Sequence, residues 1–207
     1  MEKHEEQLAA IQEMRSMMDQ ATRFKSISGL SGIIAGILAL LSVYLIYLLT
    51  GISPVEAEAL ERIWRSSSQA FVLLALLGLF VICIGIGMYF AMRNARQSGK
   101  PAWDHAAKRL LVSLAIPVIA GGIFSGLLIQ QGLVAIAAPV TLLFYGMGLL
   151  NASKYTLDAV RAVGIVFIFL GLLATYFLAY GLLIWALGFG LVHIVYGFII
   201  YVNYERA

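Results

Sequence analysis

One histidine lies where few ionisable residues are found, near the middle of an apolar run long enough to cross a bilayer. His193 is part of the closing stretch "GFGLVHIVYGFIIYVNYERA". Ionisable side chains are costly in lipid and are usually kept there for proton transfer or ligand binding. Thr141 and Tyr145 lie in another apolar run at a similar predicted depth. The pattern therefore predicts an intramembrane polar site of His193, Thr141 and Tyr145, with Thr141 as the direct partner and Tyr145 one turn further inward.

Three interpretations of His193 remain open. A neutral histidine can be packed and hydrogen-bonded by Thr141 or Tyr145, because an unpaired polar group in hydrocarbon costs several kcal/mol. The same group can serve as a proton or ligand site. It can also bind haem or a metal, although one imidazole without other ligands in range makes a poor site. The packed histidine is the preferred interpretation.

No other residues form a pattern typical of catalysis or metal binding. His105 follows Trp103 and Asp104, but one histidine and one carboxylate do not complete a metal site. Cys83 is the single cysteine, which excludes an intrachain disulfide and a multi-cysteine site. The chain contains no GxSxG, HExxH, Walker or CxxC motif. We therefore expect no catalytic residue, no metal and no cofactor, and an enzyme is disfavoured.

The composition is that of a membrane protein. Hydrophobic residues make up 61% of the chain and charged residues 12%, with a mean hydropathy of +0.92. A soluble domain carries about a quarter charged residues. The excess of basic residues is spread over short loops, so the expected partner is the lipid bilayer and no nucleic acid.

Six apolar runs have about the ~20 residues needed to span a bilayer. A continuous helix over 160–202 would be too long for one crossing, so a turn at Tyr180 and Gly181 is expected to divide it. The expected fold is all-α, a polytopic six-helix membrane bundle formed by residues 27–207. The predicted spans are 28–50, 70–92, 110–129, 133–150, 160–180 and 182–202.

The distribution of charge predicts the orientation. Twelve Lys and Arg residues fall on one side of the predicted spans, and Arg62 and Arg65 alone fall on the other. The positive-inside rule then places both termini in the cytoplasm. We see no removable signal peptide, so the first span is expected to act as the insertion signal. A multi-pass protein of the inner (plasma) membrane is the expected localisation.

The loop between the first two predicted spans is expected to hold a short amphipathic helix. Ser53 and Glu56 match a capping box, and Pro54 suits a first helical turn. The stripe Val55, Leu60, Ile63 and Trp64 suggests that this helix lies on the outer membrane surface, with a substrate lid as the alternative. Two pairs of opposite charge four residues apart should stabilise it, Glu58 with Arg62 and Glu61 with Arg65.

Residues 1–26 are expected to form a cytoplasmic amphipathic helix. Leu8, Ile11, Met14 and Met18 recur at steps of three and four opposite a charged face. Methionines give an adaptable contact surface, which suits docking to a partner or self-association. Alternatively, the stripe packs on the protein's own inner loops or on lipid headgroups.

Glycines at helical spacing predict close helix contacts. Small residues four apart let two membrane helices approach closely, within one chain or in a dimer. Such patterns include Gly32 with Gly36 and Gly122 with Gly126; Gly190 and Gly197 share a helix face with His193.

Three stretches carry a resemblance. They are "IQEMRSMMDQATRFKSISGLSGIIAG", "NASKYTLDAVR" and "GLLIWALGFGLVHIVYGFIIYVNYE". With them the chain resembles a group of uncharacterised small bacterial six-span integral membrane proteins. The resemblance implies a bacterial inner membrane location and no assigned activity or functional residue.

The preferred function is a non-enzymatic scaffold, accessory subunit or sensor that acts by helix association, as a homo-oligomer or with a partner membrane protein. One alternative is a small transporter or channel for a neutral or apolar solute. Its midplane cavity would lie near His193, between spans kinked at Pro117 and Pro139. The second alternative is a membrane enzyme acting on lipid, for which the sequence offers no nucleophile and base.

Overall fold

The computed structural model describes residues 7, 28–66, 69–97 and 105–205. Within these ranges the chain is helical and contains no strand. Six helices are long and apolar enough to cross a membrane, which indicates a multi-pass membrane protein. The elements are α2 (Gly29–Thr50), α3 (Ala59–Ser66), α4 (Gln69–Gln97), α5 (His105–Gln130), α6 (Ala137–Ala152), α7 (Asp158–Tyr176), α8 (Gly181–Ala186), η4 (Leu187–Val192) and α9 (His193–Ile200). Short turns η1 (Val134–Ile136), η2 (Ser153–Tyr155) and η3 (Leu178–Tyr180) and a π-helical segment η5 (Tyr201–Glu205) complete the chain.

The last membrane-crossing helix consists of several parts. From Gly181 to Glu205 the chain runs through α8, η4, α9 and η5 without leaving a helical path. Here η4 is π-helical, so its backbone is wider than an α-helix. The predicted turn at Tyr180 and Gly181 is slightly displaced, because the chain leaves α7 at Phe177 (φ −106°, ψ 59°).

A tertiary contact holds this turn. The backbone N–H of Glu58 donates to the carbonyl oxygen of Ala179 at 2.7 Å. This bond joins the loop before α3 to η3, the turn between α7 and α8. A periodicity argument sees only the chain on either side of the turn, so it places the break at the nearest glycine.

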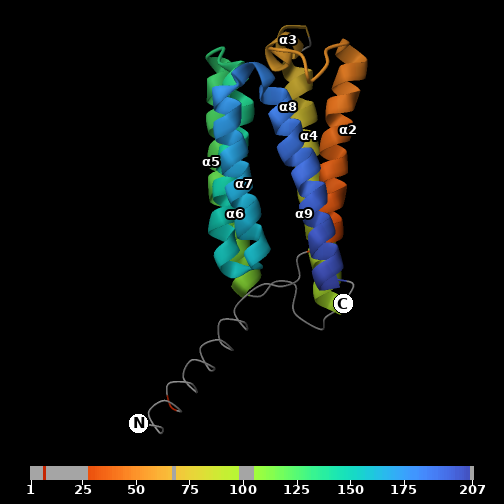
Figure 1. The fold of residues 1–207 in the computed structure, drawn as a ribbon, viewed down its shortest axis with the longest axis vertical. Coiled ribbons are helices and arrows are strands. Elements are labelled where there is room, and N and C mark those ends of the chain that lie inside the picture. Colours follow the sequence, from red (N-terminus) through yellow and green to blue (C-terminus); the bar gives the residue numbers. More distant parts are fainter. Residues whose placement is uncertain (1–6, 8–27, 67–68, 98–104, 206–207) are drawn as a thin grey trace.

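The helices form two neighbouring groups. In Figure 1, α5, α6 and α7 lie together on one side, and α2, α4 and the last helix lie on the other. The contacts agree, since α6 packs extensively on both α5 and α7, while α2 packs on α9 and η4 and also on α4. The last helix connects the groups, because α8 contacts α6 and α7 while α9 contacts α2.

The contact between α2 and α9 depends on glycines in both helices. A methyl group at Gly36 would lie 2.6 Å from the carbonyl oxygen of Gly190, and one at Gly197 would lie 2.6 Å from the backbone nitrogen of Ile33. A methyl carbon added at Gly32 would lie 3.2 Å from the Cα of Gly197. The glycines therefore allow backbone-to-backbone approach of the first and last membrane-crossing helices.

A similar contact joins α6 to α7. Added methyl groups at Gly146 and Gly164 would each meet backbone atoms of the facing helix, 2.8 Å from the Gly164 oxygen and 3.0 Å from the Gly146 oxygen. Neither glycine belongs to a GxxxG pattern. A search for small residues along one helix therefore does not find this contact, which pairs one glycine from each helix.

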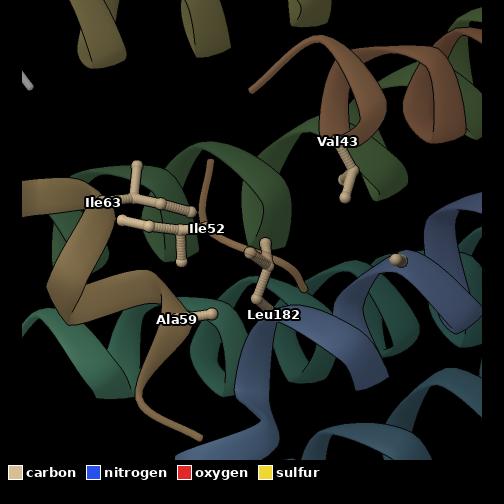
Figure 2. Close-up of a cluster of buried hydrophobic side chains, with 6 residues drawn as sticks. Val43, Ile52, Ala59, Ile63 and Leu182 are labelled. Atoms are coloured by element: carbon tan, nitrogen blue, oxygen red, sulfur yellow. The ribbon is translucent and has the colours of Figure 1, made fainter. Parts of the chain in front are cut away.

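Helix α3 packs on the ends of other helices, and its position at the membrane surface stays a prediction. Ala59 and Ile63 are buried in a cluster with Val43, Ile52 and Leu182 (Figure 2). The cluster brings together α2, the loop after it, α3 and α8. This site buries Ala59 and Ile63, whereas Val55 of the predicted stripe remains exposed. We call the end of the bundle where α3 lies the α3 end (Figure 1).

The loop before α3 is held by polar contacts around Glu56. The N–H of Ser53 donates to Oε1 of Glu56 at 2.9 Å, and Arg62 pairs with the other carboxylate oxygen. The hydrogen bond from the Ser53 N–H has the largest effect on the pKa of Glu56, followed by the bond from Arg62, and both hold this pKa below its ordinary value. The predicted pair of Arg65 with Glu61 is present at 3.1 Å, but Arg62 binds Glu56 in place of Glu58.

Proline 139 lies in the first turn of α6, so the expected kink in that span is absent. Helix α6 begins at Ala137, and the first N–H groups of a helix have no partner within it. Pro117 does lie inside α5. The N-terminal stripe of Leu8, Ile11, Met14 and Met18 lies outside the described residues, as does the pair Trp103 and Asp104.

Candidate functional site

A hydrogen bond joins the hydroxyl oxygen of Tyr145 to Nε2 of His193 at 2.9 Å. Tyr145 lies in the middle of α6, and His193 lies midway along the last helix. Both side chains are partly buried. The bond therefore connects two membrane-crossing helices near the centre of the bundle.

Thr141 does not take part in this bond. Its hydroxyl donates to the carbonyl oxygen of Ala138 in its own helix at 2.8 Å. A threonine hydroxyl in a helix readily reaches the carbonyl three or four residues earlier, and this local bond competes with longer-range ones. The longer tyrosine side chain extends its hydroxyl away from α6. Tyr145, rather than the expected Thr141, is thus the direct partner of His193.

The second ring nitrogen of His193 fixes the tautomer. Nδ1 lies 3.4 Å from the carbonyl oxygen of Gly188, five residues earlier. A carbonyl oxygen only accepts, so Nδ1 must carry the proton of this bond. In the neutral ring Nε2 is then the acceptor, and the hydroxyl of Tyr145 donates to it. His193 therefore bridges a backbone carbonyl of its own helix and the side chain of another helix.

Aromatic rings surround the bridge. Phe189 is stacked on His193, with an interplanar angle of 14° and ring centroids 5.8 Å apart. Phe167 of α7 meets both Tyr145 and His193 edge-on, at 4.8 and 5.2 Å. Trp185 extends the stack along the last helix to Phe189 at 4.8 Å. Edge-to-face and offset pairs at these separations are favourable, so the rings fix the orientation of the imidazole.

Three of these residues were not predicted from the sequence, namely Phe167, Phe189 and Trp185. Phe189 and Trp185 could have been found from the sequence, because a spacing of four residues places both on the same helix face as His193. Phe167 is fully buried on α7. Nothing in the sequence indicates which helix packs on that face, so Phe167 could not be assigned to it.

The bridge lies directly after the π-helical segment η4. This segment, Leu187–Val192, contains Gly188, whose carbonyl faces His193. The backbone N–H of His193 donates to the carbonyl of Gly190. A widened turn can leave a carbonyl group without the usual partner four residues on, and π-helical turns occur mostly as single insertions, frequently at functional sites. The imidazole supplies such a partner to Gly188.

The site offers hydrogen bonding and no ligand set for a metal. Among the described residues, no three His, Cys, Asp or Glu side chains lie close enough together to hold a metal ion. Five other polar side chains of the spans bond to backbone carbonyls. Four of them donate within their own helix, and Asn151 donates to the carbonyl of Ser113 on α5. The four are Ser31, Ser42, Thr50 and Thr175.

A surface hollow of about 310 Å³ lies between α2 and the last helix, apart from the bridge. It opens near Ser53 and Pro54 at the α3 end and reaches Leu40 and Leu191. Apolar side chains form most of its lining, and His193 and Tyr145 do not contribute to it. The hollow is therefore not a polar cavity around the histidine.

Two predicted packing glycines have no contact. A methyl group at Gly122 or Gly126 would meet no atom of the described residues within 4 Å. Both lie on α5 beside the exposed side chains of Ile119 and Ile123. The neighbouring Gly121, in contrast, packs against Phe144 of α6. The GxxxG face of α5 thus points away from the described bundle.

The chain matches no protein-family model, no curated protein and no solved structure.

Proposed function

We propose that this chain is a non-enzymatic integral membrane protein that acts by lateral association, as a scaffold, accessory subunit or sensor. The open face of α5 carries the proposal. The GxxxG pair of α2 is used up in the contact with α9, whereas Gly122 and Gly126 remain open. A glycine groove between exposed isoleucines suits the approach of another membrane helix.

The partner in this association is a second copy of the chain or another membrane protein. Helix association in a bilayer depends on close packing, since lipid is as apolar as the helices themselves. The stripe of Leu8, Ile11, Met14 and Met18 is proposed as a further docking surface on the cytoplasmic side. The resemblance to small six-span bacterial proteins is consistent with a role that needs no catalytic residue.

Charge supports the proposed orientation with both termini in the cytoplasm. Arg62 and Arg65 belong to α3, at one end of the bundle. The described basic residues of the other loops lie near the opposite helix ends, and these are Arg93, Arg96, Lys108, Arg109, Lys154 and Arg161. The positive-inside rule then makes the α3 end the outer one, in the inner membrane of a bacterium.

Neither alternative function has comparable support. A transporter for a neutral solute would need a polar path through His193, yet this side chain is bonded to Tyr145 and enclosed by aromatic rings. A lipid-modifying enzyme would need a nucleophile beside a base. The group bonded to His193 is a phenol, and it lies in the middle of a span rather than at its end.

Energy transfer between labelled copies in vesicles tests the association. Donor- and acceptor-labelled protein should associate as the protein-to-lipid ratio rises. Gly122→Leu should weaken this association because the leucine fills the groove. Gly78→Leu on α4 is the matched control, since Gly78 is equally open. Absence of association in the unaltered protein, or equal loss in both variants, would overturn the proposed role of α5.

A further inference from the structure

The last helix packs mainly on different partners in its two halves. The half formed by α8 packs mainly on α6 and α7, and its Leu182 and Ala186 also join the cluster under α3 with Val43 of α2. The half formed by α9 packs mainly on α2 through the glycine contact of Gly32 and Gly197, and its Ile200 also lies in a buried cluster with Leu157 and Val160. The segment η4 lies between these halves. A movement of α2 and α9 relative to α6 and α7 would bend or twist η4, which itself also packs on α2.

This segment departs from regular α-helical backbone bonding in the middle of the last helix. Its π-helical turn replaces the regular ladder of bonds four residues apart, and helices kink at such turns. Gly188 and Gly190 lie inside it, and glycine lowers the cost of a change in backbone angles.

His193 ties this segment to α6. One ring nitrogen bonds the Gly188 carbonyl inside η4, and the other accepts from Tyr145. Because the ring is rigid and stacked on Phe189, these two bonds fix Gly188 relative to α6. We propose that η4 is a hinge in the last helix and that the Tyr145–His193–Gly188 bridge is the latch that holds it straight.

The proposal does not rest on the association of α5. It assigns His193 a conformational role, in which release of the latch lets α9 and α2 move against α6 and α7. The hinge is a property of the chain itself and needs no bound ligand.

Distances between spin labels across η4 test the hinge. Cysteines replace the exposed Tyr180 and Phe198 in full-length Cys83→Ser protein in lipid nanodiscs. Eighteen residues of helix separate them by about 27 Å. A second pair, Val112→Cys and Gln130→Cys, has the same spacing within the single helix α5 and serves as the control.

In protein that keeps Tyr145 and His193, each pair of spin labels should give a single narrow distribution of distances. Tyr145→Phe should increase the population at a second distance for the 180–198 pair by about threefold. This is the change in an equilibrium constant that corresponds to the loss of one average interhelical hydrogen bond in a membrane. The 112–130 pair should not change. Thr141→Val, which removes a hydroxyl one turn away on α6, should leave both pairs narrow.

A distribution across η4 that stays narrow in Tyr145→Phe overturns the proposal, and so does equal broadening in Thr141→Val. Tyr145→Phe can fail to fold, so His193→Asn is measured as well. Its short side chain cannot reach Tyr145, and it should broaden the same pair. A His193→Asn protein with a narrow distribution would likewise overturn the latch.

Discussion

Tyr145 and His193 are 48 residues apart in the chain and share one hydrogen bond between α6 and the last helix. Interhelical hydrogen bonds in membranes contribute only about 0.6 kcal/mol on average. The bond therefore sets geometry more than stability. Its value lies in fixing the ring of His193, which also meets the carbonyl of Gly188.

The glycine contact between α2 and α9 predicts a large effect on stability. Gly36→Val should destabilise the protein by about 1–3 kcal/mol, since the added carbons meet the backbone carbonyl of Gly190 in η4 as well as the side chain of Ile194, and the backbone cannot yield. Gly122→Val is the control and should change stability by less than about 0.5 kcal/mol, because its surroundings are open. Unfolding in mixed micelles measures both. Equal effects would show that the contact is not as close as described.

The hydroxyl of Ser125 predicts a stabilising substitution. Ser125 is 5% exposed, and its oxygen has no hydrogen-bond partner in the part of the chain that the structure describes. A buried polar group without a partner costs about 1–3 kcal/mol. Ser125→Ala should therefore raise stability by about 1 kcal/mol. Ser153→Ala is the comparison, since it loses a bond to the Leu150 carbonyl and should destabilise. A destabilised Ser125→Ala protein would mean that the hydroxyl is paired after all.

Much of the fold follows from apolar length alone. The first predicted span, 28–50, differs by one residue from α2 (Gly29–Thr50), because lipid requires a long uninterrupted apolar helix whatever its neighbours are. The position of α3 could not be predicted in this way. Its stripe fits a membrane surface and a protein surface equally well, and the choice depends on the cluster around Ile52 and Leu182.

Partners across the bundle were harder to predict than the residues themselves. His193 is conspicuous as an ionisable residue in an apolar run, and its depth points to both Thr141 and Tyr145. Choosing between them needs the rotation of α6 and the local bond of Thr141 to Ala138. The π-helical turn at η4 leaves no mark in the sequence, since "LGFGLV" is also compatible with an α-helix.

Glu56 predicts an acid-sensitive loop at the α3 end. Its pKa is lowered in the folded protein by the Ser53 N–H and by Arg62. A lowered pKa contributes stability that is present above the unfolded value, and this contribution is lost as the pH falls through the folded value. The loop before α3 should therefore loosen at acidic pH below the ordinary range of a glutamate. Amide exchange of residues 52–58 against pH measures this, and Glu56→Gln should remove the dependence. The same acid response in Glu56→Gln would assign it to another group.

Topology can be tested with two cysteine tags in Cys83→Ser protein. Val55 is exposed beside α3, and Asn203 is exposed at the other end of the last helix. Because an odd number of predicted crossings separates them, Val55→Cys and Asn203→Cys should react with a membrane-impermeant maleimide from opposite sides. The residue 55 tag should label from outside intact cells. Labelling of both tags from one side would refute the six-span arrangement.

The most direct measurement of the packed histidine is ¹⁵N NMR of the imidazole rings in lipid. The chain has only three histidines, so His193 is assigned by comparison with His193→Asn. The account predicts a neutral ring with the proton on Nδ1 and with Nε2 accepting a hydrogen bond. Its Nε2 signal should move in Tyr145→Phe and stay in place in Thr141→Val. A proton on Nε2, or a signal that Tyr145→Phe leaves unchanged, would contradict the bridge between α6 and the last helix.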